Sequence, residues 1–167
     1  MDQRRSRFAK LLIVLVTAVL CLSSPAFAIL AEVTIAELVQ MSDHIVQATV
    51  LSTESTWNDD KTSIITTVTL HIKETYAGRL DKSTQVTVML PGGMVDGLVM
   101  EVEHAPVFIV DEEVIVFLTD INDKALRVSG WEAGKFTLEN DLIVENGIPS
   151  AQLIQQVEVA VKAAGKQ

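Results

Sequence analysis

Three histidines are the side chains best suited to acid–base chemistry or metal binding, and they lie far apart in the chain. None of His44, His71 and His104 has a second histidine three or four residues away, the spacing at which two imidazoles share one metal ion on a helix. His71 and Lys73 are expected on the same face of one strand, where the lysine charge opposes a bound cation. We therefore interpret His44 and His71 as structural or solvated residues.

His104 offers a different combination, because three carboxylates precede it closely. These are Asp96, Glu101 and Glu103, and carboxylate oxygens together with an imidazole nitrogen can hold a divalent ion. The combination supports an alternative interpretation of the chain as an envelope hydrolase or metal-dependent enzyme that uses carboxylates and His104. Our leading prediction is instead that the protein is not an enzyme and holds neither a metal nor a cofactor.

Other catalytic motifs are missing from the sequence. The acidic runs Asn58-Asp59-Asp60 and Asp111-Glu112-Glu113 lack the alternating carboxylates and distal glutamate of a calcium loop. No Gly-x-Ser-x-Gly motif occurs. We predict no catalytic residues, and name Trp57 and Trp131 as a possible binding surface. An aromatic side chain near a strand end can anchor a partner, with core or rim packing as the alternative.

The first 28 residues have the order of a secretory signal peptide. Four basic residues precede an apolar run from Leu11 to Leu22, and Ala26-Phe27-Ala28 follows shortly afterwards. The run of 12 residues is shorter than the roughly 20 that a membrane-spanning helix needs. We predict cleavage after Ala28, with Ala26 and Ala28 as the small residues of the cleavage site. Residues 29–167 are then one β-rich domain, exported by the Sec route to the periplasm or the medium, with no membrane association after cleavage.

The predicted mature segment is strongly acidic. Residues 29–167 contain 9 basic and 21 acidic side chains, which gives a net charge of −12 with neutral histidines. Such a surface repels phosphate backbones, so we predict no nucleic-acid partner. The only cysteine, Cys21, belongs to the predicted signal peptide. Packing alone must therefore stabilise the mature domain.

Short strands with a helix at each end are the elements expected to position these side chains. Thr34 and Glu37 have the spacing of a capping box, which predicts a helix over 35–41. Ser150 is predicted to cap a final helix over about 151–164. The predicted strands cover 44–57, 64–74, 85–90, 107–110, 114–118, 126–128, 135–138 and 142–144. The run 114–118 is apolar throughout, which predicts a central strand covered on both faces, and Pro91-Gly92-Gly93 predicts a turn.

This pattern predicts a mainly β fold, a small antiparallel barrel or sandwich with a short N-terminal and a C-terminal helix. The resemblance to a recurring type of uncharacterised exported bacterial β-domain is carried by residues 42–50, 67–74, 76–78, 86–88, 91–93, 105–108, 112–114, 117–118 and 134–136. Such domains are distantly similar to the netrin-like modules of metalloproteinase inhibitors. The resemblance implies a barrel of the oligonucleotide/oligosaccharide-binding (OB) type, and it supplies no catalytic residues. The cysteines of those inhibitors are missing, so their activity is not carried over.

The sequence leads us to expect an exported, non-enzymatic interaction module of unknown specificity. Its expected partner is another envelope or secreted protein, and the sequence leaves the oligomeric state open. A structural subunit of a larger envelope complex is a further alternative, which an exposed apolar patch or sheet edge would favour.

Overall fold

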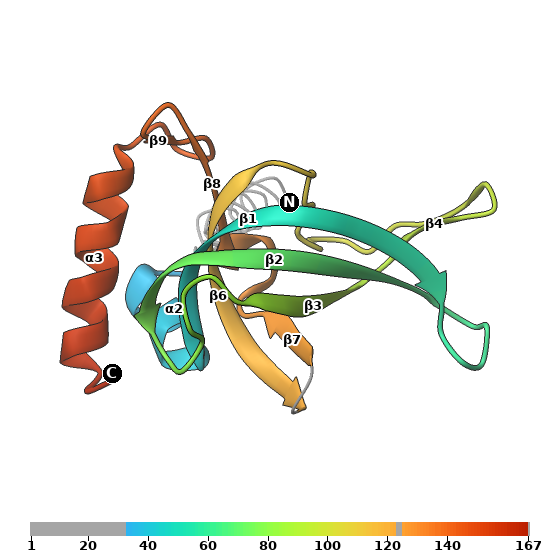
Figure 1. Ribbon diagram of the computed structural model, residues 1–167, viewed down its shortest axis with the longest axis horizontal. Helices are drawn as coiled ribbons and strands as arrows, with labels where there is room; N and C mark the ends of the chain where they lie inside the picture. The colour runs from blue at the N-terminus through green and yellow to red at the C-terminus, as the bar shows by residue number, and fades with distance from the viewer. Residues whose placement is uncertain (1–32, 123–124, 167) are drawn as a thin grey trace, which may run out of the picture. The chain divides into compact units, whose positions relative to one another are not determined.

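The computed structural model describes residues 33–122 and 125–166 (Figure 1). The predicted signal peptide, with Ala26 and Ala28, lies outside the described residues. The helical elements are α2 (Ile35–Met41), η1 (Trp131–Gly134) and α3 (Ser150–Ala163). The strands are β1 (His44–Trp57), β2 (Ile64–Ala77), β3 (Gln85–Pro91), β4 (Gly93–Val95), β5 (Leu98–Met100), β6 (Glu113–Asn122), β7 (Ala125–Val128), β8 (Lys135–Glu139) and β9 (Leu142–Ile143). Within these residues, no helix is long and apolar enough to cross a membrane.

Helix α2 is fixed at both ends by side chains. At its start, the Thr34 hydroxyl accepts a hydrogen bond from the Glu37 amide, and the Glu37 carboxylate accepts one from the Thr34 amide, which confirms the predicted capping box. At its end, the Lys166 ammonium donates hydrogen bonds to the carbonyl oxygens of Val39, Gln40 and Ser42. These carbonyls are left without partners within the helix, so Lys166 supplies a cap from a distant part of the chain.

Seven strands form one mixed sheet in the order β1-β2-β3-β7-β6-β8-β9, and β6 also pairs with β1. The pairings between β1, β2, β3, β7 and β6 therefore run around a ring. All of them are antiparallel except the contact between β3 and β7, where Val88 is opposite Leu126 in a parallel arrangement. The prediction of a purely antiparallel sheet is wrong at this pairing.

Two apolar clusters lie on the two sides of β6. Val114, Val116 and Leu118 point into the ring and pack with the inward residues of β1, β2 and β3. Ile115 and Phe117 point outward and pack with residues of α2 and α3, such as Leu38 and Leu153. The two helices pack against each other beside the sheet (Figure 1). The prediction of a central strand covered on both faces is confirmed over 114–118.

Two sequence expectations for the segment between β3 and β6 are wrong. Residues 107–110, predicted as a strand, lie outside all strands, and Val107 is 73% exposed. Pro91-Gly92-Gly93 bends the chain without ending the extended backbone, because β4 starts at Gly93 and forms a hairpin with β5. The hairpin turn is Asp96-Gly97, with positive φ at both residues, as a two-residue type I′ turn requires.

The last helix starts one residue earlier than expected. Pro149 is its N-cap, and no side chain caps it, so the predicted capping role of Ser150 is wrong. Leu153 and Val157 are buried against the outer cluster, as the helical spacing predicts. Helix α3 thus covers the outer face of the sheet, while the β4–β5 hairpin lies at the opposite end of the strands (Figure 1).

Candidate binding site

His44 is held by hydrogen bonds at both ring nitrogens. Its Nε2 lies 3.2 Å from the Asp120 carboxylate, and its Nδ1 accepts a hydrogen bond from the Arg79 amide at 3.2 Å. An acceptor at Nδ1 places the proton of the neutral ring on Nε2. Gly78, with a φ of 97°, packs so closely that a Cβ there would overlap His44. This histidine joins the β2–β3 connection to β1 and β6, which is a structural role.

His71 and His104 lie in separate places. His71 is in the middle of β2, opposite Thr49 on β1 and Gln85 on β3. His104 lies between β5 and β6, where its Nδ1 is 2.7 Å from the Glu132 carboxylate of η1. The hydrogen bond and the charge of Glu132 raise the pKa of His104 above its ordinary value.

The predicted metal ligands do not converge around His104. Its Nε2 lies 3.5 Å from the Glu103 carboxylate, whereas Asp96 is at the tip of the β4–β5 hairpin. Over residues 33–122 and 125–166, no three histidine, aspartate or glutamate side chains gather as metal ligands would. Glu132, the actual partner of His104, is 28 residues away, and nothing in the local sequence pattern points to it.

Trp131 lies in an apolar groove on the outer side of the ring. The groove has a volume of about 720 Å³ and is lined by side chains from the end of α2, from β3, β6 and β7, and from η1. Its principal lining residues are Met41, Met89, Pro106, Ile121, Arg127 and Trp131. Trp131 is 52% exposed, and Arg127 is the single ionisable side chain among the described lining residues. We call this the tryptophan groove.

The backbone around Trp131 has left-handed φ angles at two successive residues. Gly130 and Trp131 both have positive φ, 71° and 57°, and a bulky residue rarely adopts this conformation. A Cβ at Gly134 would overlap the Ser129 carbonyl oxygen, so the turn closes only with glycine there. The Glu132 amide donates a hydrogen bond to the His104 carbonyl oxygen at 3.0 Å. Together with the side-chain contact of the same two residues, this bond holds the tryptophan turn.

Trp57 lies elsewhere, at the end of β1 opposite Ile64 of β2. It does not line the tryptophan groove. The structure therefore separates the two tryptophans that sequence reasoning had grouped as one possible binding surface. Only Trp131 is part of this hollow, while Met41, Met89 and Ile121 were missed because they come from three elements whose proximity is a consequence of the fold.

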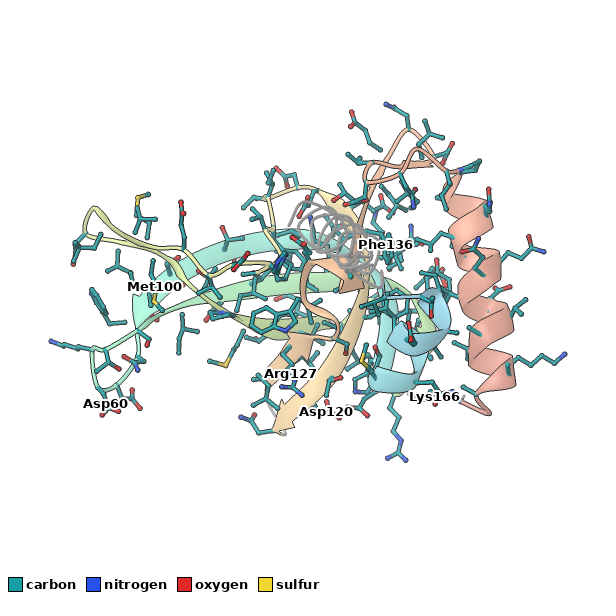
Figure 2. The ribbon with its side chains drawn as sticks, turned by 180° about the vertical axis from the view of Figure 1, so that it is seen from behind. Asp60, Met100, Asp120, Arg127, Phe136 and Lys166 are labelled. Carbon is teal, nitrogen blue, oxygen red and sulfur yellow. The ribbon has the colours of Figure 1, made fainter. Side chains whose placement is uncertain are left out.

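A second hollow, which we call the distal cleft, is lined largely by the segment that connects β5 to β6. It has a volume of about 760 Å³ and shares Leu90, Pro91 and Pro106 with the tryptophan groove. Val68 and Phe108 contribute apolar surface, and Met100 lies at the base of the hairpin that borders the cleft. Figure 2 shows Met100 at the end of the molecule away from α3.

The connecting segment 101–112, which contributes Pro106 to the lining of both hollows, is fixed by a buried ion pair. The Lys135 ammonium lies 3.0 Å from the Glu112 carboxylate, and the two side chains are only 10% and 11% exposed. The same ammonium is 5.2 Å from the centre of the Phe108 ring. A buried charge pair of this kind is costly to break on one side only, so it holds the shared wall of both hollows in place.

Comparison with known proteins adds no relative. No protein-family model matches the chain, and neither does any curated protein or solved structure. The chemistry of the two hollows is therefore the basis for a functional proposal. Both are mainly apolar, and their described ionisable lining residues are Arg127 in one and Glu101 and Glu103 in the other. This composition is typical of surfaces that bind apolar side chains.

Proposed function

We propose that the protein is an exported, non-enzymatic interaction module that binds another envelope or secreted protein through the tryptophan groove. The observation that carries this proposal is a half-exposed tryptophan, held in a strained turn, over an apolar hollow. Exposed aromatic residues beside apolar pockets are characteristic of protein-binding hot spots. Backbone strain costs stability, on the order of 1–3 kcal/mol per residue, and residues with such strain cluster at active sites and ligand-binding sites.

We also propose that the ring of β1, β2, β3, β7 and β6 is a small barrel of the OB type. The order of pairing around the ring and the one parallel contact support this assignment. Barrels of this type bind ligands on their outer strands and connecting loops. The tryptophan groove occupies the outer side of β3 and β7, which agrees with such a use of the fold.

Export belongs to the same proposal and rests on the first 28 residues of the sequence. We expect the protein purified from its own cells to start at Ile29, outside the cytosol. The intact mass and N-terminal sequence of the periplasmic and secreted protein test this. A mature protein that retains residues 1–28 would contradict the proposed cleavage after Ala28.

Site-specific photo-crosslinking tests the binding role. A photoreactive phenylalanine derivative replaces Trp131 in one variant and Val159, on the exposed face of α3, in a matched control. Irradiation in intact cells followed by mass spectrometry is expected to capture the same partner protein repeatedly at position 131 and not at position 159. Equal capture at both positions, or none at position 131, would contradict a binding site in the tryptophan groove.

A further inference from the structure

The distal half of β1 has an open strand edge. Strand β6 pairs with β1 only as far as Thr49, and the backbone of Val50 then exchanges hydrogen bonds with Asp111 and Glu112. Beyond that point, residues 52–57 pair with β2 on one side, and no strand of the described chain pairs with their other side. An unpaired edge offers a row of backbone donors and acceptors to another extended segment.

The distal cleft lies on the inner face of this same strand pair. A register shift between Val50 and Ser52 sets the later pairing, in which Thr53 is opposite Val68 and Ser55 is opposite Thr66. Thr53, Thr66 and Val68 all line the cleft. Because side chains of neighbouring strands share faces at paired positions, every second side chain of a segment added at this edge would point towards the cleft.

Carboxylates dominate the surroundings of the edge and the cleft. Segments 51–61 and 92–108 contain six acidic residues and one lysine, namely Glu54, Asp59, Asp60, Asp96, Glu101, Glu103 and Lys61. Among the residues that the structure describes, the only one of these seven in an ion pair is Glu103, with the exposed His104. Asp60 and Met100 lie at the same end of the molecule (Figure 2). A partner that approaches this end therefore meets a negative field.

We propose that an extended segment of another exported protein, with alternating apolar and basic side chains, binds here as an added β-strand. This inference rests on the proposed function as an interaction module and names the chemistry of the partner. The edge supplies backbone hydrogen bonds, the cleft receives the apolar side chains, and the carboxylates pair with the basic ones. A second copy would bring Glu54 and its acidic neighbours against themselves, and an anionic membrane or a nucleic acid would be repelled in the same way.

Three blocked peptides test the proposal on the folded mature protein. The first alternates valine and lysine, the second alternates valine and glutamate, and the third repeats the first with alternate amides N-methylated. We expect the first to bind and to shift the backbone amide resonances of residues 52–57 and 101–108. We expect no binding of the second. The third keeps the charges and side chains but cannot complete a strand ladder, so we expect its affinity to fall by about tenfold or more.

A double variant, E101Q/E103Q, tests the role of charge and leaves every buried side chain unchanged. Two exposed ion pairs contribute together about 1 kcal/mol, so we expect the affinity for the valine–lysine peptide to fall roughly fivefold to tenfold. The control is E139Q/E158Q, which makes the same change in net charge on β8 and α3. Equal losses in the two double variants would assign the attraction to net charge and overturn the local site.

Further results would also overturn the inference. They are equal binding of the valine–glutamate peptide, insensitivity to N-methylation, resonance shifts that avoid residues 52–57, and a stronger response to anionic vesicles or to self-association than to the peptide. Failure here is distinguishable from failure of the proposed function. A partner captured at position 131 without peptide binding at the edge keeps the interaction module and removes the strand-addition site, whereas peptide binding without capture at position 131 removes the tryptophan groove.

Discussion

The outer face of β6 is covered over one half and open over the other. Ile115 and Phe117 are fully buried under α2 and α3, whereas Ile121, which lies farther along the same face, is 49% exposed in the tryptophan groove. Thr119 marks the boundary, where its hydroxyl donates a hydrogen bond to the Met41 carbonyl oxygen at the end of α2. Positions along one face of the strand are thus buried where a helix covers them and exposed where the helix ends.

The largest expected effect concerns the covered half. In Phe117→Ala, a fully buried ring that makes an edge-to-face contact with Phe136 is lost. We expect the free energy of unfolding to fall by about 3–5 kcal/mol. The matched variant Ile121→Ala, on the same face, is expected to change it by less than about 1 kcal/mol. Urea denaturation followed by circular dichroism measures both, and similar losses in the two variants would contradict the division of the face.

The next effect concerns the ion pair that fixes the shared wall of the two hollows. Lys135→Met leaves the Glu112 carboxylate buried without its partner, which we expect to lower the free energy of unfolding by roughly 3 kcal/mol. The double variant Lys135→Met/Glu112→Leu removes both charges and should recover most of the loss. Denaturation curves of the two variants distinguish an unpaired buried carboxylate from lost packing as the cause. A double variant that is no more stable than Lys135→Met would rule out the unpaired carboxylate.

A smaller change in stability, of opposite sign, is expected in the tryptophan groove, where the outer face of β6 is open. Trp131→Gly removes a side chain from a residue with a φ of 57°, where glycine is unstrained. We expect thermal stability to stay the same or to rise by an amount equivalent to about 1 kcal/mol, while binding of the captured partner is lost. A destabilised variant would instead show that Trp131 serves packing, which is the alternative that the sequence left open.

The smallest effect is the pH dependence of the contact between His104 and Glu132. The folded pKa of His104 is raised, so its stabilising contribution is complete below the unfolded pKa of about 6.5 and is lost as the pH rises through the folded pKa. We expect the free energy of unfolding to differ slightly less between acidic and alkaline solution in His104→Gln than in the unchanged protein. Titration of the ring by NMR should also show a lower pKa for His104 in Glu132→Gln than in the unchanged protein.

Local patterns predicted the elements whose stabilising contacts are local. The Thr34 and Glu37 pair predicted the start of α2 correctly, because a capping box is a contact between neighbours in sequence. The unbroken apolar run 114–118 likewise identified a strand with two buried faces. The β4–β5 hairpin carried an available signal, Asp96-Gly97 between apolar pairs, which is absent from the predicted strands.

What the sequence did not predict depends on contacts between distant segments. The parallel contact of β3 with β7 and the return of β6 to β1 follow from how the whole ring closes. The apolar run 107–110 predicts a strand because apolar side chains usually mark buried positions, yet Val107 and Ile109 are exposed, and Val107 lines the distal cleft. Residue type alone could not separate Trp131, which lies in the groove at the start of η1, from Trp57, which lies at the end of β1.

The cap that Lys166 gives to α2 has a consequence for the order of events during synthesis. The ammonium that completes this helix lies 127 residues after Val39, one of the carbonyls it binds, so a growing chain emerges with the end of α2 unfinished. The covering of the sheet by α2 and α3 is likewise incomplete until the last helix has been made. Helix α2 can therefore acquire this cap, and the sheet its complete cover, only after Lys166 has been synthesised.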